Sequence, residues 1–261
     1  MKRTMRVATV LGFCWLTLAL TPNPASAEDW WSRTANPENF SATLTFATDY
    51  VFRGVSQTDN KPAVQGSFDY KHPIGLFAGL WGSNVDDYVS KGNVELDLYG
   101  GYGLELFPGF NLQAALIYYY YPGGGSDPRK DYVEGRLGAD YTLKAWPLSP
   151  KISAGYNYSP DIFGEDGDGH YTNGRLDLSL PFEFTLYGLI GYQWVEGDNS
   201  TGNGAGENGH DGFDYTHWQV GLSRPLLGFT LDVSYQDTDE ASFLGKEIAD
   251  ERVVFSVSRS F

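Results

Sequence analysis

Ionisable side chains recur at alternate positions along this chain. Glu95 and Asp97 alternate with Val94, Leu96 and Leu98, so acidic groups and apolar groups fall on opposite faces of an extended segment. Several other segments repeat the pattern, which predicts a continuous polar surface rather than a single reactive centre. Twelve residues make up the set that we expect to line this surface: Asp49, Arg53, Asp69, Glu95, Asp97, Glu134, Arg136, Asp140, Arg175, Asp177, His217 and Asp232.

Catalysis would need a nucleophile, a histidine and an orienting polar group held together. Of the histidines, only His217 lies within a strand-like pattern on the polar face, and Gln219 rather than a serine follows two positions later. We therefore expect no catalytic residue and no enzyme activity, and a hydrogen-bonding role for His217.

Residues 165–169, which read EDGDG, are a candidate metal site. Their carboxylates and glycines would suit Ca²⁺, but they lack the spacing of a twelve-residue calcium loop. We expect neither a metal site nor a cofactor.

The N-terminus has the features of an export signal. Basic residues precede an apolar stretch at 7–20, and Ala25-Ser26-Ala27 forms a cleavage motif. We predict a Sec signal peptide at 1–27 and a short arm at 28–40 that is periplasmic or, alternatively, enters the lumen. An uncleaved anchor helix is the alternative to the signal peptide, but the apolar stretch is short for one. Cleavage would remove Cys14, the only cysteine, and exclude disulfides and thiolate chemistry.

Composition limits the partners. The chain has 33 acidic and 18 basic residues among 261, a formal charge of −15, which argues against nucleic acid. Its 41% hydrophobic and 20% charged residues indicate a folded protein rather than a disordered one.

Period-two alternation indicates about twelve strands of roughly ten residues. Short connections alternate with six longer polar segments near 55–61, 84–93, 121–131, 159–170, 195–214 and 237–250. The five short connections each hold a proline: Pro73, Pro108, Pro147, Pro181 and Pro225. This layout predicts an all-β, transmembrane, antiparallel up-and-down β-barrel over 41–261, with both ends on the short-turn side.

The strand faces favour a membrane barrel over a soluble one. Apolar and aromatic side chains occupy one face, and the charged set occupies the other, as expected for a lipid-facing exterior and a wet lumen. In a soluble closed barrel, twelve strands of inward aromatics would overfill the core. In residues 42–52, the pattern predicts one strand with Asp49 and Arg53 on its lumen side.

Three short stretches of the sequence are more specific to one protein family than the alternation is. Residues 49–59, 61–66 and 79–86 read DYVFRGVSQTD, KPAVQG and GLWGSNVD. They resemble the TorF-type porin family of proteobacterial outer membranes, a family of unknown function. The resemblance implies an outer-membrane barrel with a channel and assigns no substrate. From the residues alone, this segment is either a polar constriction near the pore mouth or a loop docked by hydrogen bonds.

We expect a passive channel for small hydrophilic solutes in the cell outer membrane. Acidic residues concentrated in the last three long segments predict a weak cation preference. The alternative is an occluded barrel with a structural or surface-interaction role through its acidic loops. Expected partners are outer-membrane lipid, lipopolysaccharide, the transported solutes and the barrel assembly machinery, for which the terminal Phe261 resembles a recognition signal.

Overall fold

The computed structural model describes residues 34, 36–125, 129–197, 212–239 and 247–261. The predicted signal peptide at 1–27, most of the predicted arm at 28–40, and parts of the acidic segments near 195–214 and 237–250 lie outside the described residues.

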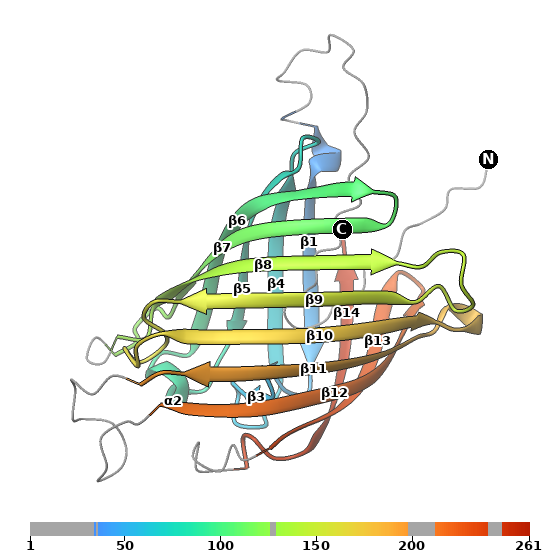
Figure 1. Ribbon diagram of the computed structural model, residues 1–261. Coiled ribbons are helices and arrows are strands. Elements are labelled where there is room, and N and C mark those ends of the chain that lie inside the picture. Colours follow the sequence, from blue (N-terminus) through green and yellow to red (C-terminus); the bar gives the residue numbers. More distant parts are fainter. Residues whose placement is uncertain (1–33, 35, 126–128, 198–211, 240–246) are drawn as a thin grey trace.

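Twelve antiparallel strands close into one barrel, in which each strand pairs with its chain neighbours and β1 pairs with β14 (Figure 1). The predicted fold class and strand number are confirmed. The barrel strands are β1 (Phe40–Ala47), β4 (Ala63–Lys71), β5 (Leu76–Asn84), β6 (Val94–Phe107), β7 (Phe110–Tyr120), β8 (Tyr132–Thr142), β9 (Lys151–Ser159), β10 (Gly169–Ser179), β11 (Thr185–Val195), β12 (Phe213–Leu226), β13 (Phe229–Thr238) and β14 (Arg252–Ser260).

Among the residues that the structure describes, the helical elements with given bounds are short. These are η1 (Pro37–Asn39) before β1, α2 (Asp87–Ser90) between β5 and β6, and η2 (Pro181–Glu183) between β10 and β11. Within the part of the chain that the structure describes, no helix is long and apolar enough to cross a membrane.

The two faces of the barrel wall are inverted relative to a soluble protein. Leu116 and Leu137 are 65% and 61% exposed on the outer face, whereas Asp97 and Glu134 on the inner face are each 1% exposed. An apolar exterior and a polar interior suit a barrel surrounded by hydrocarbon, and the closed ladder leaves no free sheet edge in it. The alternation in the sequence is thus the alternation of lipid-facing and lumen-facing positions.

Three tyrosines cross the inner wall over a glycine of the adjacent strand and reach a polar side chain one strand farther on. We call these the tyrosine–glycine rows: Tyr99–Gly79–Asp69, Tyr171–Gly191–His217 and Tyr187–Gly221–Asp232.

The row through Gly221 shows why glycine is required. A Cβ at Gly221 would lie 2.2 Å from the Tyr187 hydroxyl oxygen, which donates to Asp232 at 3.1 Å. Because no side chain occupies the glycine position, the ring occupies the space next to the wall. Bulky aromatic residues therefore line the interior without projecting far into the lumen.

The first strand is shorter than predicted. Alternation predicted one strand through 42–52, but β1 ends at Ala47, and a separate small sheet follows, formed by β2 (Val51–Phe52) and β3 (Val55–Ser56). The prediction that Asp49 and Arg53 lie on the lumen side of a wall strand is therefore wrong. The physical reason is the turn between β2 and β3, where Arg53 and Gly54 adopt φ values of 50° and 86° and reverse the chain.

Candidate functional site

The small sheet lies inside the barrel. We call residues 51–56, made of β2, the turn and β3, the inner hairpin. Its turn has two residues with positive φ, the geometry of a type I′ hairpin turn, which fits the right-handed twist of paired strands. Glycine accepts this backbone readily, whereas arginine does so at a cost, so the contacts of Arg53 must hold it there.

Asp49 anchors the base of the inner hairpin. Its Oδ1 accepts a hydrogen bond from the Ser56 hydroxyl at 2.6 Å and lies 2.7 Å from Thr58 Oγ1. Its Oδ2 accepts from Arg252 of β14 at 3.1 Å. Arg252 also donates to Asn60 at 2.7 Å, so the closing strand of the barrel holds both ends of the segment. Asp49 therefore acts as a structural hub for the inward fold.

Arg53 at the tip reaches across the lumen. Its guanidinium donates to both carboxylate oxygens of Glu134 on β8, at 2.8 and 2.6 Å, and to Gln193 on β11 at 2.6 Å. It also lies over the ring of Tyr171 on β10, 4.2 Å from the centroid. Burial lowers the pKa of Arg53, but the Glu134 carboxylate, together with Tyr119 and Tyr132, raises it overall, so the group stays charged.

Glu134 is the hydrogen-bond acceptor that holds the tip of the inner hairpin. Besides Arg53, it accepts hydrogen bonds from the Tyr119 hydroxyl at 3.1 Å and the Asn157 amide at 2.9 Å. A buried carboxylate surrounded by donors and one guanidinium is fully compensated. The network joins the inner hairpin to β7, β8 and β9.

Gly54 brings the tip into close contact with the opposite wall. A Cβ at this position would lie 2.6 Å from His217 Cβ and 2.6 Å from Thr238 Cγ2. The hairpin thus spans from the base at Asp49 to β12 and β13, and it leaves no space there for a larger residue.

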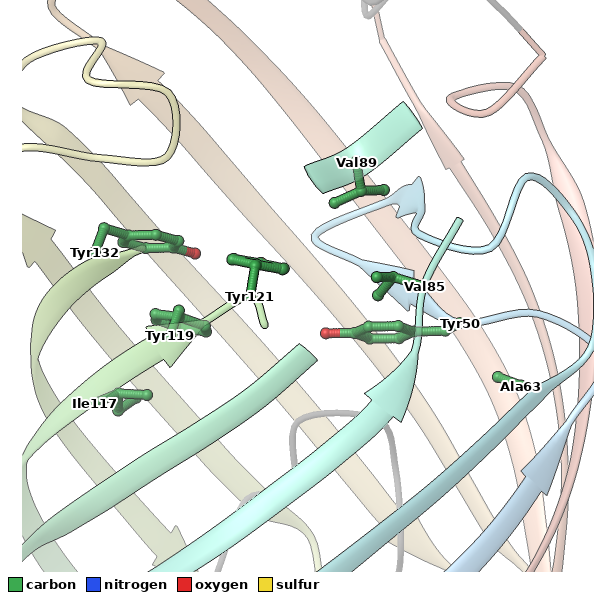
Figure 2. Close-up of a cluster of buried hydrophobic side chains, with 8 residues drawn as sticks. All are labelled: Tyr50, Ala63, Val85, Val89, Ile117, Tyr119, Tyr121 and Tyr132. Atoms are coloured by element: carbon green, nitrogen blue, oxygen red, sulfur yellow. The ribbon is translucent and has the colours of Figure 1, made fainter. Parts of the chain in front are cut away.

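One side of the lumen is filled by a hydrophobic cluster beside the inner hairpin, which Figure 2 shows. The cluster consists of Tyr50, Ala63, Val85, Val89, Ile117, Tyr119, Tyr121 and Tyr132. The ring of Tyr119 stacks on that of Tyr132 with centroids 4.3 Å apart. This packing closes the part of the interior beneath β5 to β8.

Glu95 and Asp97 lie at the edge of this cluster. Both are buried, and Glu95 accepts a hydrogen bond from the Tyr50 hydroxyl at 3.3 Å. Neither carboxylate oxygen of Asp97 has a hydrogen-bond partner among the described protein atoms. Unlike Glu134, this pair is not matched by an arginine among the described residues.

On the other side, the interior holds a polar cavity of about 120 Å³, which we call the lumen cavity. Wall residues from β8 to β14 and from β1 and β4 line it, including Asn157, Asn173, His217 and Asp232, and the inner hairpin contributes Arg53. At about 30 Å³ for each water molecule in the liquid, it has room for about four water molecules.

Every member of the predicted set faces the interior or belongs to the segment that folds into it. Arg136, Asp140 and Asp177 are half-buried, and the other nine are buried. The structure joins Arg53 with Glu134 across the lumen. Arg175 pairs with Asp177 of its own strand at 2.6 Å, rather than across the lumen.

Sequence reasoning missed the inward tyrosines and the amides of the lumen cavity. Tyr119, Tyr132 and Asn157 are each almost completely buried, and the alternation alone indicated only that they share the charged face. The reversal at Arg53 had a usable signal, because an X-Gly pair between Val51-Phe52 and Val55-Ser56 is typical of a two-residue hairpin.

Comparison with known protein families gives one match that covers most of the chain. The profile of a family described as a bacterial protein of unknown function, Gcw_chp, matches residues 32–261. The comparison with curated proteins found no match.

Solved structures share the fold at low sequence identity. A KdgM porin, solved in complex with disordered oligogalacturonate, has a TM-score of 0.55 and 10% identity, over 85% of this chain and 99% of that one. A NanC porin has a TM-score of 0.53 and 10% identity, over 84% of this chain and 97% of that one.

Proposed function

Given that this chain belongs to the Gcw_chp family of bacterial proteins of unknown function, we propose its function from its own geometry: it is an outer-membrane channel for passive diffusion of small hydrophilic solutes. The observation that carries the proposal is a polar cavity inside a wall whose outer face is apolar. The barrel resembles solved porins in fold, which supports the same class of function.

The inner hairpin sets the width of the proposed channel. Solutes pass beside it through the lumen cavity, and the hydrophobic cluster blocks the remaining cross-section. The lumen filters by size and charge, and no catalytic residue, metal or cofactor takes part. The motif at 49–66 and 79–86, on which the TorF-type resemblance rests, supplies this constriction and its docking contacts, including the Lys61–Asp86 ion pair at 2.9 Å.

We assign the twelve predicted residues to the pore lining and its constriction. Eight of them are acidic and three are arginines, so the lining carries excess negative charge. Together with acidic loops at the mouth, this favours a weak preference for cations.

The remaining parts follow from the same proposal. Residues 1–27 are a Sec signal peptide, and 28–40 form a periplasmic arm. Outer-membrane lipid and lipopolysaccharide contact the apolar wall. The assembly machinery reads Phe261, whose backbone exchanges hydrogen bonds with Ala42 at 2.9 and 3.3 Å and extends the β1–β14 closure.

A second function is favoured by the hydrophobic cluster. If the cluster and the inner hairpin together exclude ions, the barrel is occluded and acts in envelope structure or surface interaction through its acidic loops. Single-channel recording of the refolded protein in a planar bilayer under a KCl gradient distinguishes the two. We expect stable current steps with a cation-biased reversal potential; a folded barrel without current would refute the channel.

A further inference from the structure

Three buried polar atoms among the lining residues of the lumen cavity have no partner among the described protein atoms. They are Asn157 Oδ1, Asn173 Oδ1 and His217 Nδ1, on β9, β10 and β12. The three residues are 1%, 9% and 4% exposed. Buried polar groups in proteins are nearly always hydrogen-bonded, so three that share one cavity indicate a common occupant.

Neighbouring contacts fix what these atoms can accept or donate. The Asn157 amide nitrogen donates to Glu134 at 2.9 Å, which leaves Oδ1 as a free acceptor. His217 Nε2 lies 2.9 Å from the Tyr171 hydroxyl, so Nδ1 is left as either a donor or an acceptor. A hydroxyl group on the occupant can satisfy an amide oxygen and either form of the imidazole.

Charge in the lumen cavity is balanced. Asp49 and Asp232 are its acidic lining residues, and Arg53 and Arg136 are its basic ones. Asp49 is paired with Arg252, and both carboxylate oxygens of Asp232 lie 3.1 Å from the Tyr187 hydroxyl, so each carboxylate already has a protein donor. Arg53 is held by Glu134, so it does not offer its charge to an incoming anion.

Uncharged groups make up much of the remaining lining. Side-chain amides and hydroxyls come from several strands: Gln65, Gln219, Gln236, Thr45, Ser234 and Ser256. Amides and hydroxyls both donate and accept, which matches a ligand whose hydroxyls also do both.

We propose that the lumen cavity is a binding site for a small, neutral, polyhydroxylated solute. The inference rests on the proposed function, because the solute reaches the cavity through the lumen. It adds to that function a class of substrate and a binding position for it, formed by Asn157, Asn173 and His217.

The test is isothermal titration calorimetry on the refolded full-length barrel in detergent, using glucose, galactose and myo-inositol as probes. Glucuronate and glucosamine serve as the anionic and cationic counterparts. Asn173→Leu removes one unpartnered acceptor, and Gln113→Leu is the matched control, since Gln113 lies in β7 outside the lumen cavity. Heat-dependent gel mobility shows that each variant is folded.

We expect at least one neutral probe to bind, with both charged probes weaker. Asn173→Leu should raise the half-saturating concentration about five-fold, the loss of one typical hydrogen bond, and Gln113→Leu should leave it unchanged. The proposal is overturned if no neutral probe binds the folded barrel, if a charged probe binds as tightly, or if Asn173→Leu binds like the unmodified protein.

Conductance in KCl alone, measured in parallel, separates this inference from the proposed function. Current without binding of any neutral probe overturns the binding site and leaves the channel intact. Binding without current overturns the channel and leaves the binding site intact.

Discussion

A single arginine connects the inner hairpin to the opposite wall. Arg53 contacts β8, β10 and β11 through Glu134, Tyr171 and Gln193, while its own backbone adopts an unfavourable positive φ. The side-chain contacts therefore hold the strained turn in place, and the hairpin position depends on them.

Replacing Arg53 by alanine should widen the lumen and destabilise the barrel. The guanidinium leaves the cavity, while Glu134 remains buried without its cation, which costs up to about 3–5 kcal/mol in the free energy of unfolding. We expect higher single-channel conductance and a lower urea midpoint for Arg53→Ala.

The matched control is Arg129→Ala, which removes an ion pair with Asp161 at the exposed end of the barrel. That pair should contribute no more than about 1 kcal/mol and leave conductance unchanged. In a double-mutant cycle, Arg53→Ala with Glu134→Ala should recover part of the lost stability. Equal stability of Arg53→Ala and the unmodified barrel would show that the pair does not hold the hairpin.

At the scale of strands, the tyrosine–glycine rows keep aromatic rings next to the wall. Gly221→Val should push the Tyr187 ring into the lumen, because its hydroxyl lies 2.2 Å from where the new Cβ must be. Overpacking of this kind costs about 1–3 kcal/mol. We expect a lower urea midpoint and reduced conductance.

Gly188→Val is the matched control for this prediction. At Gly188 on β11, an added Cβ would meet its nearest neighbour, Gln219 O, at 3.9 Å, an ordinary van der Waals contact. It should change neither conductance nor stability appreciably. A Gly221→Val barrel with unchanged current would mean that Tyr187 does not limit the bore.

The strands were predictable because the bilayer imposes one rule on all of them. Lipid-facing residues such as Leu137 must be apolar, and inward neighbours such as Arg136 are free to be polar, so period two is visible directly in the sequence. Proline in the short connections located the turns on one edge.

The inner hairpin was not predictable from that rule. Residues 49–52 alternate like a wall strand, and only the backbone reversal at Arg53-Gly54 distinguishes them. The partners of Arg53 lie 81 and 140 positions later in the chain, at Glu134 and Gln193. Contacts that depend on barrel closure leave no local pattern, so the alternation could identify inward-facing residues but not their pairing.

At the scale of the whole molecule, the excess of acidic groups should appear as salt-dependent selectivity. Exposed charges are screened over about 10 Å at 0.1 M salt and about 3 Å at 1 M. The reversal potential under a fixed KCl ratio should therefore be cation-biased at low salt and approach zero at high salt. An anion-biased potential at 0.1 M would contradict the assignment of the acidic lining.

This barrel is proposed to conduct, with the inner hairpin setting its bore. The most direct test compares single-channel conductance of the unmodified protein with a variant in which Val51–Ser56 is replaced by Asn-Gly. That pair favours the type I′ turn, and Gln57 N already bonds Tyr50 O at 2.6 Å, so a tight turn can join them. We expect current from both barrels. The single-channel conductance of the variant should be at least about two-fold higher, because the hairpin no longer occupies the lumen. Absence of current from both folded barrels, or equal conductance, would contradict it.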